Sequence, residues 1–367
     1  MAMLPEEMIT EVLVRLPVKA ILRSRAVCRR WAVLVSSEEF CAAKDAAGSA
    51  TEPAAKLLCL SRTATLDSTE VRSSDDDGGM PLLTLNGMRG DSARMTSTPC
   101  RGLTLLHDPD SGGHHAAALP RQDILHSTTA GLGFDARTNE CKVVRLFTGD
   151  SGTPSEAFTR ARCEVHTLGG DRWMPISVEG VPCKFAGAAL FGGVCHKLPA
   201  VFADGCLHWL IQPKFHFATR PAAAVLSFSV ADETFSWVRP PPFDWEGAHL
   251  AELDGRLCMA REDLPRASVL SCLEIWKHRV DFVLLGCETG CLLTLPRYVW
   301  VVGKQGEKVI LGTSFGRVFA YDPMSQTLEL ILQLGPIPRY ETEWPFTRIS
   351  LFKERLTPVE RYNAQQQ

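Results

Sequence analysis

The spacing of hydrophobic positions divides the chain into two parts. In the first 45 residues apolar side chains recur three to five positions apart, which is typical of amphipathic helices. Beyond residue 56, apolar runs of four to eight residues alternate with Gly, Asp, Asn and Pro, as at 57–60 and 206–211. Such runs are typical of β-strands. We therefore predict a small all-α N-terminal module followed by a large all-β region.

Local signals divide the N-terminal part into several short helices. Pro5 suits the start of a helix, and Pro17 disfavours helical geometry in the residue before it, so the first helix is expected to end there. A second helix holds Leu22, and a third runs through Trp31. Residues 36–39 have the Ser-x-x-Glu spacing of a capping box, which predicts a further short helix. The first helix is expected to carry one apolar stripe made of Leu4, Met8, Ile9, Val12, Leu13 and Leu16.

Two patterns repeat in the β part. A glycine followed by an apolar strand occurs at 101–106, 204–210, 254–259 and 315–320. A second pattern, an aromatic strand with a polar turn and a returning strand, includes Phe134, Phe228 and Tyr321. These lie 94 and 93 residues apart, about twice the length of a propeller blade. The regions 165–173 and 273–276 look like degenerate copies. The repetition predicts a propeller-like domain.

Several residues inside these repeats have a structural interpretation. Tight hairpin turns require positive φ angles, which Asp and Gly adopt readily. We therefore expect Asp204-Gly205 and Asp254-Gly255 to form such turns. Large aromatic residues within strands are expected to pack between sheets rather than to anchor a ligand; these are Phe134, Trp209, Trp237 and Trp276.

Composition limits the class of protein. The chain has 367 residues, 45% of them hydrophobic, which is ample for a large core. Thirteen cysteines are scattered without a C-x-x-C pair, which indicates reduced thiols and a cytoplasmic or nuclear protein. The acidic N-terminus does not resemble a secretory signal, and no stretch approaches the roughly 18–20 apolar residues of a membrane span.

A basic cluster lies within the helical part. Six basic residues and no acidic one lie from Arg15 to Arg30, a pattern that could contact phosphates. The whole chain has a net charge of −3 and a pI near 6.4, and no aromatic residues alternate with these arginines. We therefore expect no nucleic-acid partner, and a basic face turned toward an acidic protein fits better.

Motifs for chemistry are weak. Gly312, Ser314 and Gly316 fit the G-x-S-x-G nucleophile elbow, but a strand rather than the required helix is expected to follow. His114 and His115 have no further metal ligands at a local spacing, and no Walker or dinucleotide glycine pattern occurs. We predict no catalytic residues, no cofactor and no metal site.

Three linked motifs of the N-terminal part resemble the F-box: LPEE (4–7), RLPVK (15–19) and VCRRW (27–31). The resemblance covers about residues 4–44. Later segments are similar to the F-box-associated domain of plant F-box proteins, which has kelch-like, propeller-type repeats. These segments are 133–144, 204–210, 226–235, 253–259, 273–276 and 320–329. The match is loose at 100–120, where Asp108-Pro109 replaces the usual Asn-Pro, and faint at 348–359.

The resemblance implies a role in protein ubiquitination. F-box proteins dock onto a Skp-type adaptor and, through it, onto a cullin, and they hold a target protein for ubiquitination without catalysing a step themselves. The implied adaptor-binding residues are Leu4, Pro5, Met8, Ile9, Val12, Leu13, Leu16, Pro17, Leu22, Arg25, Val27, Cys28 and Trp31. Two alternatives stay open: an F-box scaffold outside a ligase, and a propeller-type protein that binds a small ligand or glycan.

The same reasoning predicts the domain boundaries. Residues 1–45 form the F-box module, 46–56 a linker, 57–358 the β-repeat domain and 359–367 a polar tail. The target is expected to bind loops of the β domain. Neither the number of blades nor the identity of the target follows from the sequence.

Overall fold

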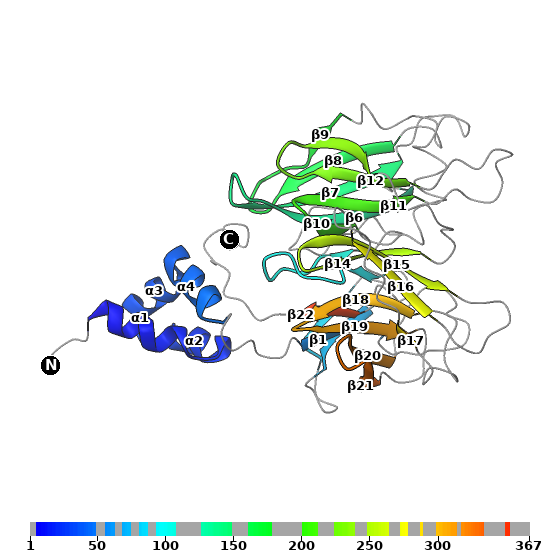
Figure 1. Cartoon of the computed structure of the whole chain (residues 1–367). Coiled ribbons are helices and arrows are strands. Elements are labelled where there is room, and N and C mark those ends of the chain that lie inside the picture. Colours follow the sequence, from blue (N-terminus) through cyan, green and yellow to red (C-terminus); the bar gives the residue numbers. More distant parts are fainter. Residues whose placement is uncertain are drawn as a thin grey trace, which may run out of the picture.

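A computed structural model describes the helices and the sheets of the chain, shown in Figure 1. The description covers residues 5–48, 56–62, 68–74, 81–86, 93–107, 126–148, 161–177, 200–211, 224–238, 248–263, 272–277, 287–288, 299–313, 317–333 and 349–352. The architecture confirms the prediction of a few short N-terminal helices followed by a large all-β, propeller-like region.

Four helices make up the N-terminal part: α1 (Glu6–Val14), α2 (Val18–Ser24), α3 (Arg29–Ser36) and α4 (Glu38–Gly48). Pro5 and Pro17 precede α1 and α2 with φ angles of −55° and −58°, which a proline ring favours. The last helix continues to Gly48, into the segment 46–56 that was expected to be a linker. Ala46 and Ala47 explain the extension, because alanine is the best helix former.

The cap of α4 differs from the predicted one by one residue. The Ser-x-x-Glu spacing indicated Ser36 as the capping residue. In the structure α4 begins at Glu38, and the Ser37 hydroxyl accepts a hydrogen bond of 3.2 Å from the Phe40 backbone N–H. Ser37 therefore satisfies one of the amides that every helix leaves unpaired in its first turn.

Antiparallel sheets contain all the described strands, and each sheet is named here by its lowest-numbered strand. The β1 sheet has the order β22 (Ile349–Phe352), β1 (Lys56–Arg62), β2 (Ser68–Ser73) and β3 (Leu83–Asn86). The β4 sheet has two strands, β4 (Arg94–Met95) and β5 (Leu106–His107). The β6 sheet consists of β6 (His126–Asp135), β7 (Glu140–Thr148), β8 (Ala161–Thr167) and β9 (Met174–Ile176).

Three further sheets repeat the four-stranded pattern. The β10 sheet consists of β10 (Val201–Ala203), β11 (Cys206–Ile211), β12 (Ala224–Ser229) and β13 (Thr234–Val238). The β14 sheet consists of β14 (His249–Leu253), β15 (Arg256–Asp263), β16 (Cys272–Lys277) and β17 (Cys287–Glu288). The β18 sheet consists of β18 (Val299–Gln305), β19 (Lys308–Thr313), β20 (Arg317–Asp322) and β21 (Thr327–Gln333).

Hydrophobic clusters join these sheets into a ring. In β19, Val309 and Leu311 pack toward the β14 sheet, and Ile310 between them packs toward the β1 sheet. Because side chains alternate along a strand, each sheet buries both faces, which explains the continuous apolar runs. Clusters of the described residues connect the β1 and β4 sheets, β4 and β6, β6 and β10, β10 and β14, β14 and β18, and finally β18 and β1.

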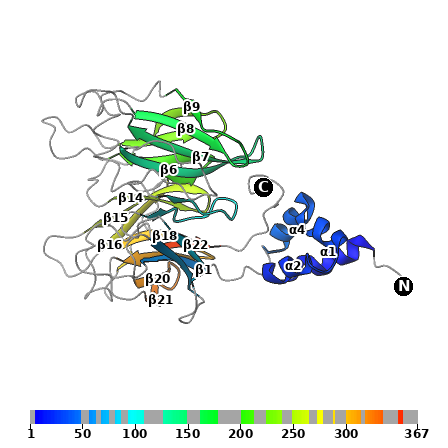
Figure 2. The ribbon, with the colours of Figure 1, turned by 180° about the vertical axis from the view of Figure 1, so that it is seen from behind.

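The two ends of the β region meet in one sheet. β22 pairs with β1 in an antiparallel ladder in which Cys59 lies opposite Ile349. The β1 sheet therefore takes one strand from the end of the ring and three from its beginning. In both views of the ribbon, the helices lie to one side of the sheets (Figures 1 and 2). This pairing closes the ring with backbone hydrogen bonds rather than by side-chain packing alone.

The glycine repeats mark the turn between the first two strands of a sheet. Asp204 and Gly205 have φ angles of 50° and 74°, and Asp254 and Gly255 have angles of 56° and 77°, which confirms the predicted positive φ. The copy at 315–320 does not match the other copies, because the glycine there precedes β20, which is the third strand of its sheet and not the second. The equivalent turn of that sheet contains Gly306, with φ 57°. Any connection between two strands favours glycine, so a glycine alone does not identify the connection.

Phe134 is not equivalent to Phe228 and Tyr321. Phe228 and Tyr321 lie in third strands, whereas Phe134 lies in β6, the first strand of its sheet. The turns after Phe134 and Tyr321 contain the same hydrogen bond, which explains why the two segments look alike in sequence. Asp135 accepts a hydrogen bond from the backbone N–H two residues on, and Asp322 does the same. The degenerate copies at 165–173 and 273–276 do contain third strands, β8 and β16.

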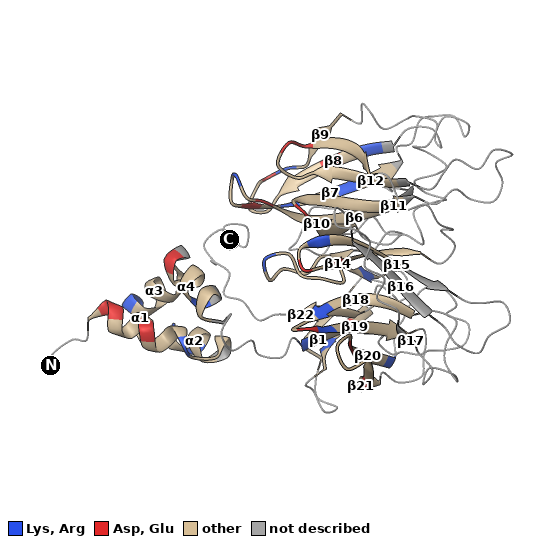
Figure 3. Cartoon of the chain, viewed as in Figure 1, with Lys and Arg blue, Asp and Glu red and all other residues tan. Residues whose placement is uncertain are grey.

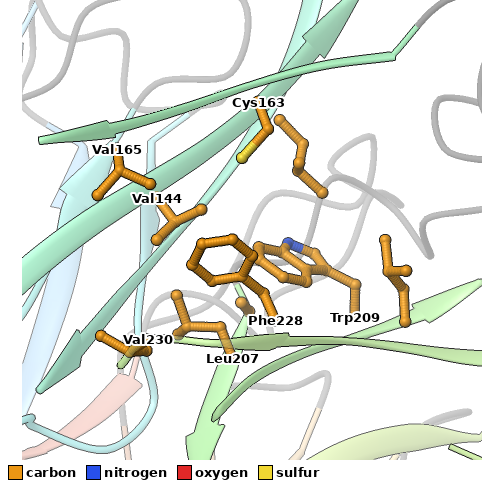
Figure 4. Packing of buried hydrophobic residues seen from close by; sticks show 10 residues of the cluster. Val144, Cys163, Val165, Leu207, Trp209, Phe228 and Val230 are labelled. Atoms are coloured by element: carbon orange, nitrogen blue, oxygen red, sulfur yellow. The ribbon is translucent and has the colours of Figure 1, made fainter. Parts of the chain in front are cut away.

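The predicted aromatic packing is seen between the β6 and β10 sheets. Trp209 and Phe228 are buried there, with the Phe228 and Phe235 rings 4.9 Å apart between centroids. Figure 4 shows Trp209 and Phe228 facing Val144 of β7. Trp237 packs against the same cluster. Phe134 packs in the cluster between the β4 and β6 sheets, and the side chain of Trp276 lies outside the described residues.

Candidate functional site

The helical module is built around a core of its own. Leu13 of α1, Ile21 of α2, Val35 of α3 and Phe40 of α4 are buried together, so every helix contributes to this core. Large apolar side chains nevertheless remain on its surface, with exposed fractions of 54% for Met8, 62% for Val12, 46% for Leu22, 64% for Val27 and 69% for Val33. Exposed apolar side chains in this number on a small module are candidates for contact with another protein.

The geometry of α1 separates its apolar residues into two groups. A single stripe was predicted, but Ile9 and Leu13 face the core, whereas Met8 and Val12 face solvent. Successive residues of a helix are rotated by about 100°, so the pair at 8 and 12 lies on a different side from the pair at 9 and 13. One side of α1 therefore stabilises the module, and the other is available to a partner.

Further exposed apolar residues lie in α2 and just before α3. Leu22 of α2 is exposed next to the buried Ile21, and Val27 and Cys28 are exposed just before α3. Trp31 is half-buried and packs against the core of the helices. The indole can therefore support the core and contact a partner at once, as a large aromatic at the edge of a core often does.

The structure places the predicted adaptor-binding residues in three groups. The exposed ones are Pro5, Met8, Val12, Pro17, Leu22, Val27 and Cys28. The half-buried ones are Ile9, Leu16, Arg25 and Trp31. Leu13 is only 2% exposed, so it can act only by holding its neighbours in place. Leu4 lies outside the described residues.

Polar contacts fix the arrangement of the helices. The Lys44 ammonium of α4 donates hydrogen bonds of 2.9 Å to the carbonyl oxygens of Val14 and Leu16. The Val14 carbonyl belongs to the last residue of α1 and the Leu16 carbonyl lies just beyond the helix, so the lysine satisfies acceptors at this end and complements the helix dipole. At the other end of α1, Arg30 of α3 forms an ion pair of 2.9 Å with Glu6. Both ends of α1 are thus held by other helices.

One exposed residue was not predicted. Val33 of α3 is 69% exposed, although it lies between the half-buried Trp31 and the buried Val35. Two positions along a helix correspond to a rotation of about 200°, so a residue two before a core position points away from the core. The spacing from Val35 could have identified it, but the F-box motifs do not include this position.

The basic cluster is partly neutralised. Arg15 pairs with Glu11 at 2.9 Å and Arg30 pairs with Glu6, so two of the six basic residues have acidic partners within the module. Figure 3 shows acidic residues at the start of α1 close to basic ones. Arg23 and Arg29 are exposed and extend the apolar surface with positive charge. This arrangement suits a partner that combines apolar and acidic groups.

The other motifs with possible chemistry do not form a site in the described residues. Ser314 and Gly316 of the G-x-S-x-G sequence, and also His114 and His115, lie outside these residues. The segment that follows is strand β20, as predicted, and not the helix of a nucleophile elbow. Within the described ranges, no three or more His, Cys, Asp or Glu residues could hold a metal ion. No helix in this part of the chain could span a membrane.

The target was predicted to bind loops of the β region without a choice among them, and several long connections lie outside the described residues. The segments 149–160, 212–223 and 264–271 each connect the second and third strands of a sheet. The target site predicted on loops of the β region therefore stays a prediction.

Comparison with known proteins matches the N-terminal part to a family model and most of the chain to two relatives. The family model described as F-box-like matches residues 1–40. An Arabidopsis thaliana protein described as a candidate F-box protein is 23% identical over 278 residues, which is 71% of this chain and 70% of that protein. A second such Arabidopsis protein is 24% identical over 241 residues, 65% of this chain and 57% of the relative.

Among solved structures, apo AztD from Citrobacter koseri is similar to the chain with a TM-score of 0.34 and 15% identity. The similarity covers 77% of this chain and 70% of AztD. A TM-score of this size does not establish a common fold, so the ring described above rests on its own strand pairing and packing.

Proposed function

We propose that this chain, a plant-type F-box protein with an F-box-like domain at residues 1–40, is the substrate-recognition subunit of a Skp–cullin–F-box ubiquitin ligase. One observation carries the proposal. The four helices complete a core of their own and still expose Met8, Val12, Leu22 and Val27. A module that is already folded gains nothing from such exposure unless a partner covers these side chains.

The proposed adaptor surface consists of the exposed members of the predicted set, with Trp31 at its edge. Each fully buried apolar side chain contributes on the order of 1–3 kcal/mol to association. Several of them together can support a stable complex even after the entropic cost of association. Leu13 and Lys44 stabilise the surface from within, since the one belongs to the core and the other holds the end of α1.

The β ring has the complementary role in this proposal. It would hold a target protein so that lysines of the target lie near the ubiquitin-conjugating enzyme. The rate gain then comes from proximity, without a covalent step by this chain. The scattered cysteines of the sequence, with no C-x-x-C pair, support work in the cytoplasm or nucleus.

The proposal is tested with two matched variants of the full chain. Met8→Asp combined with Val12→Asp places two charges on the proposed surface, whereas Met324→Asp places one on an 88% exposed methionine of the β ring. The double variant is expected to bind a purified Skp adaptor about 100-fold more weakly, because about 3 kcal/mol of apolar contact is lost. Met324→Asp is expected to bind normally.

Circular dichroism of both variants controls for folding. Adaptor binding that is undiminished in a folded double variant would refute the proposed surface. Adaptor capture without cullin-dependent ubiquitination of any captured protein would instead favour the scaffold alternative. Targets can be sought by affinity capture under proteasome inhibition, since proteins ubiquitinated with the natural chain but not with the double variant are the expected substrates.

A further inference from the structure

Two cysteines from distant parts of the chain meet between the β4 and β6 sheets. Cys100 lies in the hairpin between β4 and β5 and is 6% exposed, and Cys141 of β7 is half-buried. Both belong to the cluster that joins these two sheets. Their side chains are hydrogen-bonded to each other, and both cysteines are reduced.

Backbone contacts hold Cys100 and Cys141 in position. Cys100 pairs with Leu103 across a tight turn in which Arg101 and Gly102 have φ angles of 51° and 80°. On the other side, the Cys141 carbonyl accepts a hydrogen bond of 2.9 Å from the Leu168 N–H. Each cysteine thus lies in a segment held by its own sheet. The two thiols stay close only because the sheets pack together.

The side chain of Arg101, which follows Cys100, lies over the ring of Phe134, which is a neighbour of Cys141. The Arg101 guanidinium carbon is 4.0 Å from the centre of the Phe134 ring. Phe134 of β6 is directly opposite Cys141 of β7 in the strand register, so the two side chains lie on the same face of the sheet. The Arg101 charge is therefore held beside the Cys141 sulfur by a rigid stack.

This environment makes Cys141 the more reactive thiol. The hydrogen bond with Cys100 lowers its pKa from the ordinary value, burial opposes this, and the Arg101 charge adds to the lowering. Two buried cysteines of the ring differ sharply from Cys141, since burial raises the pKa of Cys59 and of Cys163 to about 12. The thiolate is the nucleophile, so oxidation is expected to be selective for this site.

We propose that Cys100 and Cys141 form a hydroperoxide-sensitive thiol pair that closes to a disulfide between the β4 and β6 sheets. The Cys141 thiolate attacks the terminal oxygen of the hydroperoxide, so that an S–O bond forms, the O–O bond breaks and an alcohol leaves. For hydrogen peroxide itself the leaving product is water. The Cys100 sulfur then displaces water from the Cys141 sulfenic acid, and the S–S bond forms.

The step balances without any further reagent. Two thiols lose two electrons and two protons in total, and the hydroperoxide is reduced to one alcohol and one water. Cys100 is the resolving thiol because it is 6% exposed, whereas Cys141 is half-buried and has the lowered pKa. The proposal is independent of the ubiquitin-ligase function and would hold for the ring in any role.

The experiment treats the full-length natural chain with an equimolar amount of hydrogen peroxide. The chain is then unfolded in guanidinium chloride, its remaining thiols are blocked with iodoacetamide, and it is digested with trypsin. The two cysteines fall in separate peptides, MTSTPCR (95–101) and TNECK (138–142). We expect these peptides to appear linked, with the loss of two hydrogens, and dithiothreitol to separate them. Cys59 and Cys163 are expected to react more than tenfold more slowly than Cys141.

Two variants sharpen the test. Cys141→Ser should leave Cys100 alkylated in full after peroxide, whereas Cys163→Ser, a buried thiol of the neighbouring cluster, should leave the link unchanged. The measurement on the natural chain does not depend on the folding of either variant. The proposal is overturned if both peptides remain alkylated after peroxide, or if Cys141 gains oxygen irreversibly without a link to Cys100.

Discussion

The Lys142 ammonium in β7 lies 2.8 Å from the Glu233 carboxylate in the turn after β12, so one ion pair joins two neighbouring sheets of the ring. The same ammonium lies 3.2 Å from Asp135 and donates to the Val230 carbonyl at 3.2 Å. Side-chain exposure is 8% for Lys142 and 1% for Asp135. Burial favours the neutral amine, but both carboxylates outweigh it and raise the Lys142 pKa.

Removal of this lysine is expected to destabilise the ring. In Lys142→Met, the buried Asp135 carboxylate loses its ammonium partner and keeps only the exposed Arg137 guanidinium at 3.9 Å, and breaking a buried pair in this way costs about 3–5 kcal/mol. The matched control is Lys308→Met, because Lys308 forms an exposed pair with Glu329 at 3.0 Å. That control is expected to change the free energy of unfolding by less than about 1 kcal/mol. Urea unfolding followed by tryptophan fluorescence measures the unfolding free energy of both variants. Equal losses of stability in the two variants would contradict the difference between a buried and an exposed ion pair.

Asp135 is expected to make the ring sensitive to acid. Burial alone would raise its pKa, but the Arg137 and Thr138 N–H groups and the Lys142 ammonium outweigh burial and hold this pKa below the ordinary value. The charged form is therefore favoured by folding. Its contribution to stability is present above the unfolded pKa of about 3.9 and is lost as pH falls through the lower, folded pKa.

The test compares the natural chain with Asp135→Asn in urea unfolding at pH 7, 4 and 3. The asparagine variant should be less stable at pH 7, and the difference between the two proteins should shrink toward pH 3. A difference in unfolding free energy that stays constant with pH would contradict the role of this carboxylate.

Leu13 is expected to be a stability residue rather than a contact residue. Leu13→Ala removes a side chain that is 2% exposed in the helical core, and such changes cost about 2–5 kcal/mol. The helical melting transition of the full chain, followed at 222 nm, should shift to lower temperature. Met8→Ala, on the exposed side of α1, should leave that transition nearly unchanged while adaptor binding weakens. A stable Leu13→Ala module with impaired adaptor binding would contradict this division.

Gly131 of β6 is expected to be required for close packing of the β6 and β10 sheets. A Cβ atom on Gly131 would lie 2.6 Å from the Ala200 Cβ and 2.8 Å from Leu207 Cδ2. The Ala200 Cβ is attached to the backbone and cannot turn aside, so Gly131→Ala should cost about 1–3 kcal/mol of unfolding free energy. Gly306→Asn is the control, because its Cβ meets nothing within 4 Å and asparagine tolerates φ near 57°. Thermal unfolding of the two variants should differ by several degrees.

The strand β22 is expected to close the ring. Deletion of residues 349–367 removes this strand and leaves the β1 edge unpaired, with Leu57 and Cys59 of the adjoining cluster uncovered. We expect that shortened chain to unfold at lower denaturant concentration and to aggregate through its open edge. Deletion of residues 353–367 keeps β22 and should preserve the natural midpoint. Equal midpoints for both deletions would show that closure contributes little.

Local chemistry explains which sequence predictions were correct. Pro5 precedes the first helix and Pro17 lies just after its end at Val14, because the proline ring restricts φ and disfavours helical geometry in the residue before it. Asp204-Gly205 and Asp254-Gly255 adopt the turn angles that their residue types favour. These properties belong to short stretches of chain, so they can be inferred without knowing what surrounds them.

The errors of prediction share a different origin. Phe134 was grouped with Phe228 and Tyr321 because the turns after them are alike, yet only the pairing of strands shows that β6 is a first strand. Likewise, the apolar residues of α1 form one stripe by spacing alone. Only packing against α4 decides that Leu13 is inside and Val12 outside.

The sequence by itself determined the division into helices and strands, the F-box motifs and the turn geometry, since all of these depend on residues close together in the chain. The tertiary structure alone decided the closure of the ring by β22, the meeting of Cys100 with Cys141, and the face of α1 that remains exposed. Each of these depends on segments far apart in sequence, and their contacts exist only after the sheets and helices have packed. Hydrophobic burial drives that packing without direction, so the identity of the neighbours follows from the completed fold and not from any one segment.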